Sequence, residues 1–145
     1  MTEVRFYDPL YEPDAGLTYS VIVARFIDKW LFVRHGNRDT WEIAGGHIES
    51  SESSSDAASR ELREEIGAGK FNIKCVATYS VLKDGSEGYG RLYFAEVFEL
   101  TEIPDISEIA EITFLDHLPE KLTYPDIQPH LFTKTVEYLK EEGML

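Results

Sequence analysis

The segment Gly46–Ala68 reads GHIESSESSSDAASRELREEIGA, and its spacing decides the expected fold and chemistry. Its second half is typical of a helix, on which Glu61, Glu64 and Glu65 occupy positions i, i+3 and i+4 and share one face. Carboxylates placed in this way repel one another, by about 0.2–0.5 kcal/mol per pair on an isolated helix. A divalent cation would turn that repulsion into coordination, so the spacing predicts a metal site.

The same segment carries the signals that begin and end a helix. Serines at 53–55 offer a hydroxyl cap, and Asp56 in the first turn suits the positive end of the helix dipole. Gly67 stands where a helix commonly ends in the left-handed conformation. The apolar residues that recur every four positions, and so predict a stripe facing the core, are Ala58, Leu62 and Ile66.

Outside this segment, runs of β-branched and aromatic residues predict strands. The expected elements are strands over 17–26, 30–34, 41–43, 71–82, 91–100 and 111–115, a short extended piece at 48–49, and a C-terminal helix over 126–142. The many hairpins favour an α/β fold with a mixed sheet flanked by helices over a doubly wound parallel sheet. A length of 145 residues fits a single domain, 1–145.

Composition limits the classes of partner. The chain is 43% hydrophobic, which is enough for a packed core, and its net charge is −13. Such a surface repels nucleic-acid backbones and anionic membranes, so we expect neither DNA nor a membrane as a partner. An anionic substrate would need cations supplied at the site.

The cellular setting is expected from similar absences. Cys75 is the single cysteine, so no intrachain disulfide can form, and it is interpreted as a small buried hydrophobe. The N-terminal residues show no basic segment followed by an apolar run. No apolar stretch approaches the roughly 18 residues that span a bilayer. We therefore expect a cytoplasmic protein, as a monomer or a homodimer.

The pattern G-x5-E-x7-R-E-L-x-E-E-x-G-A resembles the box of the Nudix hydrolase family. The residues that fill its specified places are Gly46, Glu52, Arg60, Glu61, Leu62, Glu64, Glu65, Gly67 and Ala68. The resemblance implies an α/β/α sandwich and agrees with the expected order of elements. Ala44 and Ser51 replace a proline and a glycine that are usual in the family, but these are unspecified places and no ligand is lost.

The resemblance also implies a reaction, the hydrolysis of a nucleoside diphosphate linked to another group X. The implied ligands of Mg²⁺ or Mn²⁺ are the Gly45 carbonyl and the carboxylates of Glu61, Glu64 and Glu65. Arg60 lies about 100° around the helix from Glu61. We therefore expect it to pair with Glu52 or to orient the glutamates from the side.

The general base is left open between Glu61 and Glu108, with Glu96 and Glu111 as further alternatives. The expected substrate is a small nucleotide-like molecule, namely a nucleoside triphosphate or an oxidised purine nucleotide. An RNA 5′ end also fits the family, but the strong negative charge disfavours long RNA.

Three other hypotheses remain beside hydrolysis. A nucleotide-sensing module would keep the fold without turnover, but it usually loses carboxylates of the box. An isoprenoid diphosphate isomerase would need a catalytic counterpart to the single cysteine. A calcium-binding protein would carry a D-x-D-x-D-G loop, which is absent. The histidines at 35, 117 and 130 lack metal-ligand spacing and are interpreted as structural or exposed.

Overall fold

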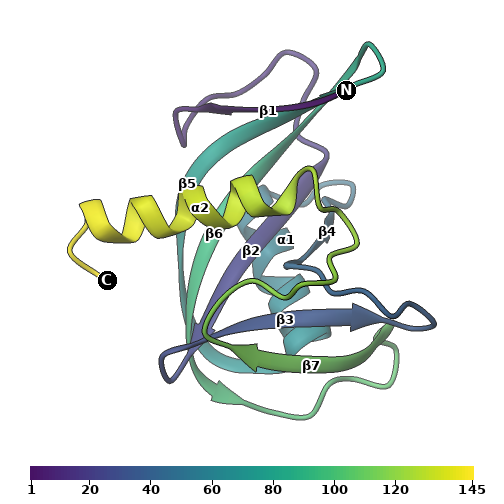
Figure 1. Cartoon of the computed structure of the whole chain (residues 1–145), viewed down its shortest axis with the longest axis vertical. Coiled ribbons are helices and arrows are strands. Elements are labelled where there is room, and N and C mark those ends of the chain that lie inside the picture. Colours follow the sequence, from purple (N-terminus) through teal and green to yellow (C-terminus); the bar gives the residue numbers. More distant parts are fainter.

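A seven-stranded mixed sheet forms the centre of the computed structural model, which describes all 145 residues (Figure 1). The strands are β1 (Thr2–Tyr7), β2 (Tyr19–Phe26), β3 (Lys29–His35), β4 (Ala44–His47), β5 (Ala68–Lys83), β6 (Ser86–Leu100) and β7 (Ile109–Leu115). Their order is β1-β5-β6-β2-β3-β7, while β4 pairs with β2 off this path. Only β2 and β6 run parallel, so the predicted mixed sheet is confirmed.

Strand β2 divides one of its edges between two partners. Its end at Ala24–Phe26 pairs with β3, and its beginning at Tyr19–Ile22 pairs with β4. Strand β3 therefore diverges from β2, and β4 fills the space that opens between them. This arrangement builds Gly45 and Gly46 into the sheet beside the first helix.

The first helix has two parts, α1 (Ser54–Glu61) and a π-helical turn, η1 (Leu62–Ile66). The Ser53 hydroxyl caps α1 by accepting the Asp56 N–H at 3.1 Å. Gly67 ends η1 with φ of 75°, and a Cβ there would collide with the Thr101 carbonyl oxygen. The predicted caps are thus confirmed, whereas the π-helical turn departs from the regular helix that the spacing predicts.

Two hydrophobic cores lie on opposite faces of the sheet. Helix α2 (Gln128–Glu141) crosses one face and α1 lies behind the other (Figure 1). Ala58, Leu62 and Ile66 are completely buried in the core under α1 and η1, as their spacing predicts. On the other face, Leu131 and Leu139 of α2 pack in the second core. The three layers confirm the expected sandwich.

No helix combines the length and apolar character needed to cross a bilayer.

Several element boundaries differ from the expectations. Strand β1 is not predicted at all, although it pairs with β5 along its whole length. Strands β5 and β6 extend further than expected and leave only Asp84–Gly85 as their turn. The glycines at 88 and 90 favour a loop in the sequence, but both pair with β5. The Tyr79 ring lies where a Cβ of Gly90 would stand, so this strand position requires glycine.

Candidate active site

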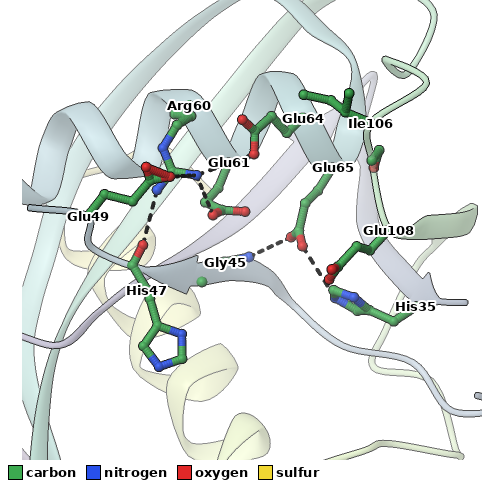
Figure 2. Close-up of a pocket in the computed structure, with 12 residues that line it drawn as sticks. His35, Gly45, His47, Glu49, Arg60, Glu61, Glu64, Glu65, Ile106 and Glu108 are labelled. Carbon is green, nitrogen blue, oxygen red and sulfur yellow. Dashed lines mark hydrogen bonds and ion pairs between the residues drawn. The ribbon is translucent and has the colours of Figure 1, made fainter. Parts of the chain in front are cut away.

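A cavity of about 420 Å³ opens where β4, the first helix and residues 106–108 meet (Figure 2). Five of its lining residues are glutamates and one is apolar. The lining residues are His35, Gly45, Gly46, His47, Glu49, Arg60, Glu61, Glu64, Glu65, Ile106, Ser107 and Glu108. The predicted metal ligands, Arg60 and both leading candidates for the base line this cavity, whereas Glu52 is reached through Arg60.

The Glu61 carboxylate lies against Gly46. A Cβ on Gly46 would stand 2.7 Å from Glu61 Oε1, so any larger residue would displace the carboxylate. Glu61 is only 8% exposed. Burial, and then the negative charge of Glu65, raise the pKa of Glu61, while Arg60 acts in the opposite direction. The site therefore holds a carboxylate whose charge is costly unless a cation is near.

Arg60 binds the carboxylates on one side of the cavity. Its Nε and Nη2 donate to the two oxygens of Glu52, at 2.7 and 2.9 Å, in a bidentate pair. Its Nη1 donates to Glu61 at 2.8 Å and to Glu64 at 3.3 Å, and Nη2 also donates to the His47 carbonyl at 3.0 Å. The hydrogen bonds from Arg60 lower the pKa of Glu52 to about 2.

On the other side of the cavity, Glu65 is bound by the backbone and by a histidine. The Gly45 N–H donates to Glu65 Oε1 at 2.9 Å, and His35 Nε2 lies 3.3 Å from Glu65 Oε2. The same nitrogen lies 3.7 Å from Oε1 of Glu42. Interaction with Glu65 raises the pKa of His35, although burial opposes it.

Sequence reasoning missed His35 and Glu42. Neither belongs to the box, and no spacing along the chain relates either of them to Glu65. The contact depends on the end of β3 lying beside η1, which only the tertiary structure shows. The interpretation of His35 as structural or exposed does not anticipate this position, in which its imidazole lines the cavity.

Glu108 is the other acidic residue that the structure brings to the cavity. Its carbonyl accepts the Gly36 N–H at 2.9 Å, which fixes the backbone beside His35. Its side chain lines the cavity together with His35 (Figure 2), and no ion pair engages it. Of the further alternatives for the base, Glu96 pairs with Arg25 and Glu111 pairs with Arg34, and neither reaches the cavity.

The chemistry of the donors fits a hard divalent cation. Glu61, Glu64 and Glu65 offer carboxylate oxygens to one cavity, and the lack of a side chain at Gly46 makes room for the Glu61 carboxylate. As they stand, no three carboxylate, imidazole or thiol groups converge closely enough to hold an ion. Arg60 instead pairs with Glu61, and the His35 imidazole lies beside Glu65. The Gly45 carbonyl stays a predicted ligand.

Comparison with known proteins gives the same result as the box. Residues 16–130 match the model of the NUDIX domain. The chain belongs to the Nudix family. Within this family it is similar to YtkD of Bacillus subtilis, provisionally named an 8-oxo-dGTP diphosphatase, with 33% identity over 102 residues. It also resembles the RNA pyrophosphohydrolase of Halorhodospira halophila, with 33% identity over 63 residues.

The similarity covers these relatives only in part. The matched region is 70% of this Nudix chain but 64% of YtkD, and 43% of this chain but 33% of the Halorhodospira protein. Among solved structures, a variant of the Bacillus subtilis pyrophosphohydrolase BsRppH matches with a TM-score of 0.76 and 26% identity, over 94% of this chain and 90% of that one. A UDP-X diphosphatase shares the fold, with a TM-score of 0.73 and 18% identity over 92% and 68% of the two chains.

Proposed function

We propose that this Nudix chain hydrolyses a diphosphate linkage in a nucleoside diphosphate linked to X. The observation that carries the proposal is the burial of Glu61 and Glu65 in the wall of a cavity that also contains Glu64. Buried carboxylates are costly, and a site that keeps several of them together suits a bound cation. Similarity to pyrophosphohydrolases supports the same reaction class.

Mg²⁺ or Mn²⁺ is the proposed cofactor, held by the Gly45 carbonyl and by Glu61, Glu64 and Glu65. A bound divalent cation would neutralise the diphosphate and lower the pKa of a water molecule. Arg60 keeps Glu61 and Glu64 directed toward the cavity, and it is itself fixed by its bidentate pair with Glu52.

Glu108 is the general base that the geometry favours, and Glu61 is the alternative. A base must be free to accept a proton from water within the cavity. The Glu108 carboxylate lines the cavity without an ion-pair partner, whereas Glu61 already accepts a hydrogen bond from Arg60 at 2.8 Å. Glu61 is also needed as a metal ligand in the same proposal.

The proposed substrate is a nucleoside triphosphate or an oxidised purine nucleotide. A cavity of about 420 Å³ is in the range typical of small-molecule sites, about 300–1,000 Å³. The provisional name of YtkD supports an oxidised purine nucleotide. The relatives named RNA pyrophosphohydrolase support a 5′-triphosphate end, but a net charge of −13 disfavours long RNA.

A substrate panel tests the proposed function. Nucleoside triphosphates, oxidised nucleotides, dinucleoside polyphosphates, ADP-ribose and a short 5′-triphosphate RNA are incubated with Mg²⁺ and the wild-type chain, Glu64→Gln or Glu108→Gln. We expect Glu64→Gln to lower kcat/KM by roughly 100-fold or more, because a charged ligand of the cation is lost. Glu108→Gln should lower kcat and leave KM nearly unchanged.

Glu137→Gln is the matched control, since it makes the same change at an exposed position of α2. It should leave hydrolysis unchanged. Equal activity in the wild-type chain and Glu64→Gln contradicts the proposal. Tight nucleotide binding without any Mg²⁺-dependent product would instead indicate a sensing module on the same fold.

A further inference from the structure

His35 lies between two buried carboxylates that come from different parts of the chain. Its Nε2 is 3.3 Å from Oε2 of Glu65, in η1, and 3.7 Å from Oε1 of Glu42, in the segment before β4. Glu42 and Glu65 are each only 7% exposed. Because carboxylates at this depth are costly unless they are paired, the imidazole is placed where both need a partner.

The remaining oxygens of these carboxylates are also engaged. Arg38 Nη1 donates to Glu42 Oε2 at 2.6 Å, and the Gly45 N–H donates to Glu65 Oε1 at 2.9 Å. Each carboxylate therefore has one partner on each oxygen, with His35 serving one oxygen of both. The result is a continuous row of contacts from Arg38 through Glu42, His35 and Glu65 to Gly45, whose last three members appear in Figure 2.

No arginine or lysine forms an ion pair with Glu65. Arg60 reaches Glu61 and Glu64 but not Glu65, whose nearest basic side chain is the imidazole of His35. The carboxylates on the two sides of the cavity are thus held by different residues. Arg60, a residue of the box, holds Glu61 and Glu64, whereas Glu65 is held by a residue at the end of β3, outside the box.

We propose that His35 is a positioning residue for Glu65, which it keeps directed toward the cavity, and that Glu42 in turn holds His35. A neutral imidazole with its hydrogen on Nε2 is sufficient for this role. The inference rests on the proposed function, because Glu65 matters to the reaction as a ligand of the divalent cation. It assigns positioning roles in the site to His35 and Glu42.

The tautomer of His35 gives the first test, on the metal-free wild-type chain. Long-range ¹H–¹⁵N spectra of the imidazole, assigned through the ring protons to the backbone, show which nitrogen carries hydrogen. We expect hydrogen on Nε2, since this nitrogen faces both carboxylates. An Nε2 without hydrogen cannot donate to Glu65 and would overturn the proposal.

Mn²⁺ binding to the chain without nucleotide gives the second test. Titration followed by electron paramagnetic resonance compares the wild type with His35→Ala, His35→Gln and the control His130→Ala, an exposed residue of α2. Loss of a residue that orients a ligand typically weakens metal binding about 10- to 100-fold, which we expect for His35→Ala. His35→Gln should restore part of the affinity, because its amide still donates, and His130→Ala should match the wild type.

Unchanged Mn²⁺ affinity in His35→Ala would overturn the role of His35. Thermal unfolding of each variant shows whether a loss of affinity reflects a loss of fold, and partial rescue by His35→Gln with an equal Tm excludes that explanation. The two proposals fail in different ways. A wild-type chain that binds Mn²⁺ but cleaves no member of the panel contradicts the proposed function alone.

Discussion

Arg60 is the common hydrogen-bond donor for the carboxylates on its side of the site. Its guanidinium forms a bidentate pair with Glu52 through Nε and Nη2 and uses the remaining nitrogen, Nη1, for Glu61 and Glu64. Because the fork is planar and rigid, the pair with Glu52 fixes the direction of the other bonds. Glu52 is therefore an anchor for Arg60, and this role has a consequence for stability that can be measured.

Glu52→Gln should reduce stability in a pH-dependent way. Arg60 and the Glu49 N–H lower the pKa of Glu52 from 4.5 to about 2, so the charged form is favoured in the folded chain. Such a group contributes stability above its unfolded pKa, and the contribution disappears as the pH falls through the folded pKa. The difference in unfolding free energy between wild type and variant should be constant above about pH 5.5 and shrink between about pH 4.5 and pH 2.

Urea unfolding at a series of pH values measures this difference. Glu137→Gln serves as the control, since it changes the same functional group at an exposed position on α2. Its difference from the wild type should show no comparable pH dependence. A Glu52→Gln difference that stays constant down to acid pH would show that Arg60 does not stabilise the charged carboxylate.

At the scale of elements, local signals predict what lies within one segment. The serine cap, the apolar stripe and Gly67 place the first helix correctly, because each acts within a few residues of its own position. The box likewise identifies three of the five glutamates that line the cavity, Glu61, Glu64 and Glu65. The π-helical turn is not predictable in the same way, because Leu62–Ile66 carries ordinary helix-forming residues. Around this turn, Glu61 and Glu65 are buried while the Glu64 side chain is 36% exposed.

Features that depend on distant segments escape sequence reasoning. The contact between His35 and Glu65 joins residues that no motif relates, and Glu42 reaches His35 only because β3 ends beside η1. Strand β1 is missed for a similar reason. Its residues alternate between partly buried and exposed positions, and the pairing with β5 that stabilises it lies more than seventy residues away in the chain.

The turn between β2 and β3 offers a direct test of local strain. Ile27 and Asp28 both have positive φ, of 46° and 64°, and Ile27 is 74% exposed. A β-branched residue is disfavoured in this region, where asparagine and glycine are preferred. Ile27→Asn should therefore stabilise the chain by about 1 kcal/mol and raise Tm by about 2–4 °C.

Thermal unfolding followed by circular dichroism measures the change. Ile27→Val is the matched control, because it keeps the branched Cβ and should leave Tm nearly unaltered. If the asparagine variant melts at or below the wild-type temperature, the turn does not carry the strain that its dihedral angles indicate.

At the scale of the whole molecule, charge opposes the entry of the proposed substrate. The chain has 27 acidic and 14 basic residues, and the basic side chains beside the cavity, Arg38 and Arg60, are already paired with glutamates. A nucleotide anion therefore approaches a surface of its own sign. At low ionic strength this repulsion reaches further, since the Debye length is about 30 Å at 0.01 M and about 10 Å at 0.1 M.

Added salt should consequently speed the encounter. With Mg²⁺ saturating, we expect kcat/KM to rise a few-fold as KCl increases from about 0.02 to about 0.2 M, because screening weakens the repulsion. The kcat value should change little, since it reports steps after binding. Initial rates at low nucleotide concentration measure the effect, and a steady fall of kcat/KM with KCl would indicate attraction instead.

Because β4 pairs with one edge of β2, one wall of the cavity belongs to the central sheet and is stiffer than the other wall. Gly45 and Gly46 are paired through the backbone with Val21 and Ser20, so this wall cannot retreat without breaking the ladder of the central sheet. The opposite wall at 106–108 belongs to an irregular segment whose backbone is tied back at few points, such as the Gly36 N–H on the Glu108 carbonyl. We expect ligands of different size to be accommodated by movement of that segment, while the wall formed by Gly45 and Gly46 stays in place.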